Sequence, residues 1–201
     1  DLDGFLKVEG LHEGSWSFLR SEAKGFYPSL NLTVAGETKV HPLFPAKMMQ
    51  ALLSLVREAR GPGPGGETGA VIWGQVKSPV SGAGIQVQLE DAPDVKPVYL
   101  NELLIPDEKL TSTTAAGYFA FVDLPRGFYS VRALRKDRQI AVGNVEVDNE
   151  TASTLELNES MTTHPVQVSV YDGFTGSPQQ AHVEIQNFES SLPVQGLAEI
   201  R

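Results

Sequence analysis

The stretch Thr113–Ala133 constrains the fold more than any other part of the sequence. Apolar residues alternate with other residues in both of its halves, as they do on strands that bury one face. Between the halves, the segment from Leu124 to Gly127 has the composition of a turn. The sequence therefore predicts a β-hairpin here. The alternating residues are Phe119 and Phe121 on the first strand, and Tyr129, Val131 and Ala133 on the second.

Length and charge bound what such a chain can do. The chain has 201 residues, a formal net charge of −9 and no cysteine. This length allows one large domain or two to three small ones. The acidic balance argues against binding to nucleic acid or to an anionic membrane surface. Without cysteine there are no disulfides, thiolate nucleophiles or cysteine zinc sites. No apolar run is long enough to cross a membrane as a helix, so we expect no membrane insertion.

The first 60 residues predict an N-terminal β-rich segment with one helix. Short alternating patches at 5–8, 16–19 and 30–34 are typical of strands. Residues 45–60 carry apolar side chains on one face, as in an amphipathic helix. Its methionines would suit a groove for a partner, but packing on a sheet is the favoured interpretation. The Gly- and Pro-rich segment 61–69 predicts a linker and a domain boundary.

Residues 70–157 predict a complete β-sandwich, because about seven short strands alternate there with turn signals. The pattern starts again at 162–201, where it predicts a partial second sandwich and an internal repeat. Such a half-sandwich leaves an edge and an apolar face open. Two explanations fit: the protein continues past Arg201, or strands from the first 36 residues complete the second sandwich. The chain begins with Asp1, which favours a mature exported protein.

Three motifs together resemble the carboxypeptidase regulatory-like domain family. They are Trp73–Val76, Gly82–Leu89 and the stretch Thr113–Ala133. The resemblance covers about residues 70–157 and implies a transthyretin-like sandwich, also similar to the B-type repeats of bacterial collagen adhesins. It implies secreted, periplasmic or cell-surface modules without catalysis of their own. The expected fold class is therefore mainly β, with tandem transthyretin-like or Ig-like antiparallel sandwiches and one amphipathic helix near residues 45–60.

Two departures limit what the resemblance implies. Adhesin-type relatives often carry a Lys–Asn isopeptide bond promoted by a buried acid. Lys77 and Asn149 would be the pair here, but Ala133 stands at the position of the acid, so we expect no bond. The fold also hosts a hydroxyisourate hydrolase, whose catalytic His and Arg residues and terminal motif have no counterpart here. We therefore expect no such hydrolase.

No motif in the sequence indicates an enzyme. Asp1–Gly4 resembles part of a calcium loop but lacks the remaining oxygen ligands. The four histidines are far apart, and no pair has the spacing of metal ligands on a helix. There is no Gly-x-Ser-x-Gly nucleophile motif. The sequence thus predicts no catalytic residues, no metal site and no cofactor.

The candidate site is the segment Asp91–Leu110, which joins two strands that a minimal sandwich connects by a short loop. It mixes acidic and apolar groups, as would suit a protein partner, a basic peptide or a cation. The alternative is that residues 98–105 form an extra edge strand packed on their own domain. The predicted site residues are Asp91, Asp94, Tyr99, Glu102, Asp107 and Glu108.

These observations predict a non-catalytic, exported module that serves envelope or surface architecture and binds a protein or a glycan. Two alternatives stay open: accessory domains of a larger secreted enzyme, and a periplasmic assembly or secretion component. An extracytoplasmic location, whether periplasmic, cell-surface or secreted, follows from the family resemblance. A strip of exposed aromatic side chains in the folded protein would favour glycan binding.

Overall fold

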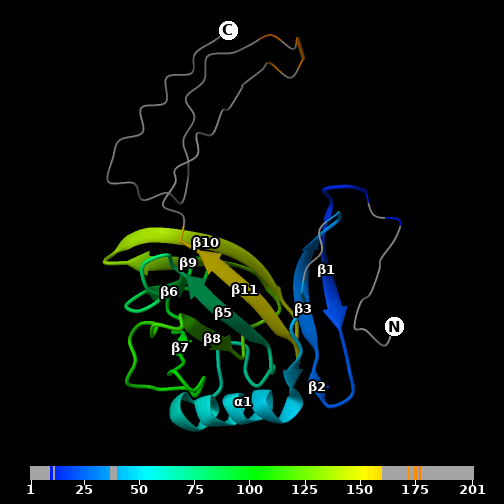
Figure 1. Cartoon of the computed structure of the whole chain (residues 1–201). Coiled ribbons are helices and arrows are strands. Elements are labelled where there is room, and N and C mark those ends of the chain that lie inside the picture. Colours follow the sequence, from blue (N-terminus) through cyan, green and yellow to red (C-terminus); the bar gives the residue numbers. More distant parts are fainter. Residues whose placement is uncertain are drawn as a thin grey trace. The chain divides into compact units, whose positions relative to one another are not determined.

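A computed structural model of the chain describes residues 10, 12–36, 40–159, 172, 174, 175 and 177. The chain divides into two compact units, Asp1–Glu159 and Ser160–Arg201. The strands predicted at 5–8 and within 162–201 lie outside the described residues. The described part is mainly β with a single helix, which confirms the predicted class (Figure 1).

The strands of the first unit form two packed sheets and a small ribbon. The larger sheet has six strands in the order β1-β3-β11-β5-β8-β7, the smaller has the order β10-β9-β6, and β2 pairs with β4. Most pairs are antiparallel, but β11 runs parallel to both β3 and β5. The strands are β1 (Trp16–Ser21), β2 (Phe26–Tyr27), β3 (Ser29–Val34), β4 (Phe44–Pro45), β5 (Val71–Lys77), β6 (Gln86–Leu89), β7 (Val98–Tyr99), β8 (Tyr118–Val122), β9 (Gly127–Arg135), β10 (Arg138–Val147) and β11 (Ala152–Asn158).

The six-stranded sheet is buried on both faces at its centre. Successive side chains of a strand point to opposite faces, and β5 and β8 carry apolar residues at both parities. Ile72 and Phe121 pack towards the three-stranded sheet, whereas Val71 and Trp73 pack towards the helix. Gly74 belongs to the first face, where its Cα leaves room for the ring of Phe119, which a Cβ would meet at 2.0 Å. The unit therefore has three layers.

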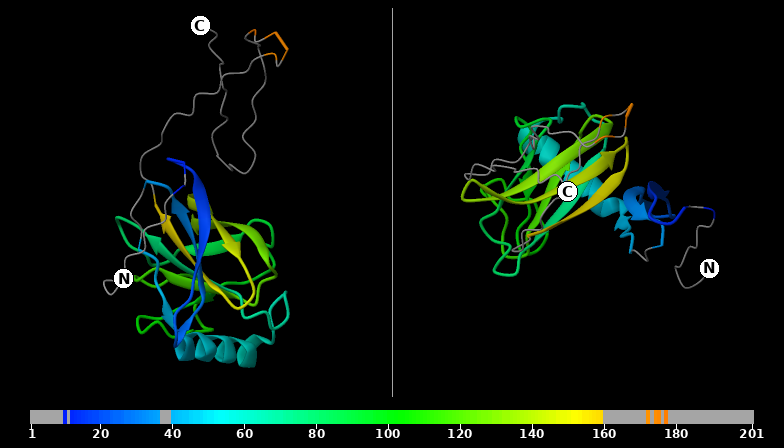
Figure 2. Two further views of the ribbon diagram at one scale, coloured as in Figure 1. Left: turned by 90° about the vertical axis from the view of Figure 1, so that its right-hand side faces the viewer. Right: turned by 90° about the horizontal axis from the view of Figure 1, so that it is seen from above.

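The helix α1 (Ala46–Arg60) forms the third layer and lies across the outer face of the six-stranded sheet (Figures 1 and 2). Packing on a sheet, the favoured interpretation of its apolar stripe, is what the structure shows. The helix ends at Gly61, which has φ 79° and donates its N–H to the carbonyl of Arg57 at 2.8 Å. The buried residues of the stripe are Met49, Leu52, Leu53 and Val56.

The predicted hairpin within Thr113–Ala133 is wrong. β8 pairs with β5 and β7, whereas β9 pairs with β6 and β10, so the two strands belong to different sheets. Their apolar residues meet face to face in one core, and alternation is the same whether two strands pair or face each other. The hairpin is instead β9–β10, turned by Lys136 and Asp137 with φ 51° and 63°.

A buried aspartate fixes the arch between β8 and β9. Asp123 has φ 53° and is fully buried. Its carboxylate accepts two hydrogen bonds of 2.7 Å from Arg57 and one of 2.9 Å from the N–H of Gly69. Burial alone would raise the pKa of Asp123, but the hydrogen bonds from Arg57, Gly69 and Gly63 outweigh it and hold that pKa below its usual value.

The Gly- and Pro-rich segment 61–69 packs against this arch. A Cβ on Gly63 would lie 2.7 Å from the carbonyl oxygen of Val122, and one on Gly65 would lie 2.7 Å from the backbone nitrogen of Pro125. Backbone approaches backbone so closely that no side chain fits at either position. The glycines that predicted a flexible linker therefore allow close packing within the unit.

The first 60 residues share a sheet with residues 70–157. β3 pairs with β11, with Ala152 opposite Ser29, and β1 extends the sheet beyond β3. The boundary predicted at 61–69 therefore lies within one compact unit, and the only division falls between Glu159 and Ser160. β11 would otherwise end the sheet on this side, and β3 covers that edge where it pairs with Ala152 and Ser153. In the described residues β3 adds to this sheet and not to a second sandwich.

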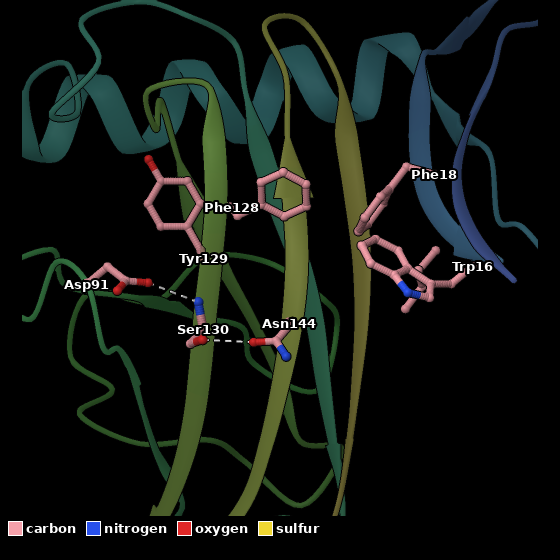
Figure 3. A pocket seen from close by; sticks show the side chains of 8 residues that line it. Trp16, Phe18, Asp91, Phe128, Tyr129, Ser130 and Asn144 are labelled. Carbon is pink, nitrogen blue, oxygen red and sulfur yellow. Dashed lines mark hydrogen bonds between the residues drawn. The ribbon is translucent and has the colours of Figure 1, made fainter. Parts of the chain in front are cut away.

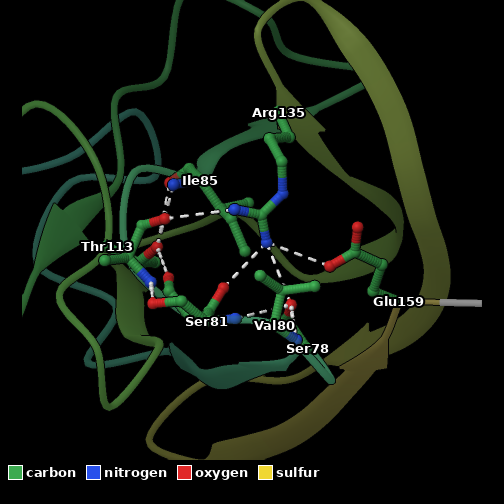
Figure 4. A network of polar contacts seen from close by, with 9 residues as sticks. Ser78, Val80, Ser81, Ile85, Thr113, Arg135 and Glu159 are labelled. Carbon is green, nitrogen blue, oxygen red and sulfur yellow. Dashed lines mark hydrogen bonds and ion pairs between the residues drawn. The ribbon is translucent and has the colours of Figure 1, made fainter.

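A polar network holds the last residue of the first unit. The guanidinium of Arg135 on β9 donates hydrogen bonds to Ser78 Oγ at 3.0 Å and to the carbonyl of Ser81 at 2.7 Å (Figure 4). It also pairs with the carboxylate of Glu159 at 3.0 Å. Hydrogen bonds from Ser78 and Arg135 keep the pKa of Glu159 below its usual value despite its desolvation. Glu159 is thus tied to the loop that follows β5.

Candidate functional site

A surface pocket of about 420 Å³ lies where the two sheets meet beside β1 (Figure 3). β1 and β3 form one wall, and β9 and β10 form the other. Asp91, at the start of the predicted site segment, closes one side. We call this pocket the aromatic groove. Its lining residues are Trp16, Phe18, Leu32, Asp91, Phe128, Tyr129, Ser130 and Asn144.

Three aromatic rings follow one another along the groove. The ring of Trp16 lies edge to face with that of Phe18, with centroids 6.1 Å apart. Phe18 in turn contacts Phe128 across the gap between the sheets, with centroids 5.6 Å apart. Trp16 is 64% exposed and Phe128 is 61% exposed. Large apolar rings rarely stay so exposed in a row unless they meet a ligand.

Polar groups lie beside the rings on the β9–β10 wall. Asp91 accepts a hydrogen bond of 3.3 Å from the N–H of Ser130 through Oδ2, and Ser130 donates from Oγ to Asn144 Oδ1 at 2.8 Å (Figure 3). Asp91 and Asn144 are exposed. Among the described residues, Asp91 Oδ1 and Asn144 Nδ2 have no hydrogen-bond partner, so one acceptor and one donor face outward.

Tyr129 forms the buried base of the groove. Its hydroxyl donates to the carbonyl of Pro125 at 2.8 Å, which fixes the ring against the arch. Burial, and to a smaller extent the nearby Asp91 carboxylate, raises the pKa of Tyr129. The phenol is therefore neutral at physiological pH, and Asp91 is the one Asp, Glu, His, Lys or Arg side chain in the lining.

The predicted site residues do not form one site. Asp91 alone lines the aromatic groove, and Asp94 occupies an exposed turn. Tyr99 is only 5% exposed and its hydroxyl accepts the N–H of Val87 at 2.9 Å, so it belongs to the core. Residues 98–99 form the edge strand β7, as the alternative interpretation expected for this part of the segment.

The acidic residues that follow β7 gather elsewhere. Glu102 is exposed, and Asp107 caps the local turn by accepting the N–H of Lys109 at 2.9 Å. Glu108 pairs with Arg60 at 2.6 Å. These three residues surround the loop beyond β7, whereas Asp91 precedes that strand. The single predicted site is therefore two separate regions.

The aromatic residues of the groove were not among the predicted site residues. Trp16 and Phe18 were interpreted only as strand residues, although their i, i+2 spacing places both rings on one face. Phe128 lies out of phase with the buried Tyr129 and Val131, which marks it as an aromatic residue on the solvent side of β9. An aromatic residue at a strand position whose neighbours of the same face are not buried, such as Phe128, was the sequence signal that could have indicated this groove.

No group of three potential metal-ligating side chains occurs within the described ranges. Lys77 forms an ion pair with Glu156 on the neighbouring strand β11. Asn149 lies in the turn before β11, and Val71, at the other end of β5 from Lys77, pairs with Ala152. Six residues of strand, about 20 Å at roughly 3.3 Å per residue, therefore separate Lys77 from the Asn149 end. The two cannot form an isopeptide bond in this arrangement.

Comparisons with known proteins assign neither a family nor a function to the chain. No family model matches the chain, and a search of curated proteins finds no match. A structural neighbour is a DUF3823 family protein from Bacteroides uniformis, with 18% sequence identity and a TM-score of 0.23. The match covers 43% of this chain and 42% of the neighbour, so it spans less than half of either protein. Within the described residues, α1 is neither long nor apolar enough to span a membrane.

Proposed function

We propose that the chain is a non-catalytic, exported β-sandwich module that binds a glycan in the aromatic groove. One observation carries this proposal: three consecutive rings and outward-facing polar groups line the same pocket. A pyranose ring has one face rich in C–H groups, which packs against aromatic rings, and a rim of hydroxyls, which exchange hydrogen bonds with carboxylates and amides. The groove offers both kinds of contact.

Size and charge support the same class of ligand. A volume of about 420 Å³ falls within the range of roughly 300–1,000 Å³ that is typical of small-molecule sites. Asp91 is an acceptor and Asn144 Nδ2 a donor, so a neutral, hydroxyl-rich ligand satisfies both. A nucleic acid would place phosphates beside Asp91, and no Lys or Arg lines the pocket to offset the repulsion.

A non-catalytic role fits the same lining. Acid–base hydrolysis of a glycoside needs two carboxyl groups about 5–10 Å apart across the bond, and the groove has Asp91 alone. Glycan binding suits both a module of the cell surface and an accessory domain of a larger secreted enzyme. An extracytoplasmic location is part of the proposal and rests on the family resemblance of residues 70–157.

The test is a glycan screen of the purified full chain, followed by calorimetry on the best ligand. We expect Trp16→Ala to lower the affinity by about tenfold or more, because bases stacked on aromatic side chains contribute about 1–3 kcal/mol each and sugar stacking is comparable. Trp16→Phe should lose less, because a ring remains.

Phe26→Ala is the matched control. Phe26 is an aromatic residue of β2 that is 42% exposed and does not line the groove. Its substitution should leave glycan affinity unchanged. Equal losses in the Trp16 and Phe26 variants, or no binding to any glycan by the folded chain, would refute the proposal.

A further inference from the structure

The loop that follows β7 exposes three consecutive apolar side chains. Leu103 is 77% exposed, Leu104 41% and Ile105 47%. We call residues 103–105 the apolar tip. A run of three exposed apolar residues reduces solubility and is uncommon on a protein surface unless it serves a contact. None of the three contributes to either hydrophobic core.

The apolar tip is held in one conformation by hydrogen bonds to the side chain of Asn101 and within the local backbone. Asn101 Oδ1 accepts the N–H groups of Leu103 at 2.9 Å and Ile105 at 3.1 Å. The N–H of Asn101 donates to the carbonyl of Ile105, and that of Leu104 to the carbonyl of Asn101, each at 2.9 Å. A bridge between Leu100 and Pro106 closes the base of the loop. A partner would therefore meet a preorganised surface, which lowers the entropic cost of binding.

The residue at the centre of the tip, Leu104, is of a type that its backbone conformation disfavours. Leu104 has φ +60°, a left-handed conformation in which Gly and Asn are preferred because a larger side chain is strained there. Local folding thus gives no reason for a leucine at this position. Strained residues of this kind cluster at sites of function, so the side chain points to a requirement from outside the chain.

The charges around the apolar tip favour one type of partner. Glu102 and Asp107 flank it, whereas Glu108, just beyond, is paired with Arg60, and Lys109 is the only base between residues 101 and 110. Acidic flanks repel an anionic lipid surface. They complement basic residues around an apolar cavity of another protein, as in other interfaces where charge pairing at the rim directs association.

We propose that the apolar tip docks into an apolar pocket of a partner protein whose rim carries Lys or Arg side chains. β7 and β1 are the two outer strands of the six-stranded sheet, so the tip and the aromatic groove lie at opposite edges. The module can hold a glycan at one edge and a protein at the other. This docking does not depend on the glycan-binding function.

The partner is to be found by cross-linking the full chain in its source cells, with a photo-reactive residue at position 103. The same residue at position 80 is the control, because Val80 is also exposed, at 75%, but belongs to the loop that follows β5 and not to the tip. A protein captured from position 103 and not from position 80 is then purified, and its affinity for the chain is measured at low and high salt.

We expect the Leu103→Ser, Ile105→Ser double variant to bind that protein at least about tenfold more weakly, and Val80→Ser to bind as the wild type does. Glu102→Lys should also weaken binding, and salt should reduce the affinity of the wild type. Absence of a position-specific cross-link, or undiminished binding by the double variant, would overturn the proposal.

Two further measurements test whether the apolar tip binds a membrane or a second copy of the chain instead of a partner protein. Flotation with vesicles of phosphatidylcholine alone or with phosphatidylglycerol, if it depended on Leu103, would replace a protein partner by a membrane. A dimer in sedimentation that the double variant abolishes would replace it by a second copy of the chain.

Leu104→Asn should keep or raise the Tm by about 2–4 °C, because Asn relieves the strain. A clear fall in Tm would show instead that Leu104 serves the fold.

Discussion

The two outer strands of the six-stranded sheet end it in opposite ways. β7 has two residues, Val98 and Tyr99, which are 1% and 5% exposed, and all of its side chains belong to the core. β1 has six residues, none of them buried, and it presents Trp16 to solvent. A short, covered strand protects the β7 edge, whereas the β1 edge leaves aromatic rings exposed.

The comparison shows why residue type alone did not identify the site. Tyr99 was a candidate because it is an aromatic residue within an acidic segment, but its hydroxyl bonds to Val87 within the core. The sequence around Trp16 predicts only a strand, whereas in the structure Trp16 lines the groove. Exposure in the folded chain, which depends on the neighbours of a strand, separates the two roles.

The largest expected effect is a difference in the free energy of unfolding between a variant at the β7 edge and a variant at the β1 edge. Tyr99→Ala should lower the free energy of unfolding by about 3–5 kcal/mol, because it removes a buried aromatic ring and leaves a cavity. Trp16→Ala should change it by no more than about 0.5 kcal/mol, as is usual for surface positions. Urea unfolding of both variants measures the difference. Similar costs at the two positions would show that the edges do not differ as described.

An intermediate effect is expected where the helix fixes the sheet near the β7 edge. Arg57→Met removes the partner of a fully buried carboxylate and should cost about 3 kcal/mol at pH 7, the lower end of the range for broken buried pairs, because Arg57 itself is 26% exposed. Arg20→Met is the control, since its partners Glu22 and Asp148 are 62% and 31% exposed and neither is buried. A cost no larger than that of the control would contradict the assigned role of Asp123.

The same variant predicts a change in pH dependence. The folded pKa of Asp123 is lowered, so its ionised form stabilises the fold above the unfolded pKa of about 3.9, and this contribution is lost as the pH falls through the lower folded value. Wild type should therefore lose stability below about pH 4. The Arg57→Met variant should lose less stability over that pH interval, because the ionised form of Asp123 no longer receives the hydrogen bonds of Arg57. Unfolding midpoints at pH 7, 5 and 3 provide the measurement.

The smallest expected effect concerns the ion pair beside the loop after β7. Arg60 and Glu108 are 29% and 42% exposed, so Glu108→Gln should cost only about 0.2–1 kcal/mol, as for other surface pairs. The loss should shrink in high salt, where such pairs are screened. A loss that persisted unchanged in 1 M salt would mean that Glu108 is more than a surface partner.

Much of the secondary structure could be predicted from the sequence, because local pattern determines it. The helix expected over 45–60 occupies Ala46–Arg60, and the strands expected at 71–76 and 153–157 are Val71–Lys77 and Ala152–Asn158. Strand partners could not be predicted in this way. The alternation around Phe119 and Val131 is identical for a hairpin and for two facing sheets, and no local signal distinguishes them.

The composition of segment 61–69 was also misleading, because its glycines serve close packing and not flexibility. Gly63 and Gly65 predicted a flexible linker, yet they let the chain lie directly on the backbone of the arch. Of the candidate site, Asp91 was found because it lies in a long inter-strand segment. The aromatic wall was not, because Trp16 and Phe128 are 112 positions apart in the sequence and meet only through the sheet order.

The position of β11 has a consequence for the order of events during synthesis. β11 lies between β3 and β5, and Asn31 on β3 accepts a hydrogen bond from the N–H of Thr154, 123 residues later. At about 5–20 residues per second, a ribosome needs roughly 6–25 s to make that interval. Until then the β1–β3 ribbon has no strand to join. The aromatic groove is therefore completed only after β11 has been made.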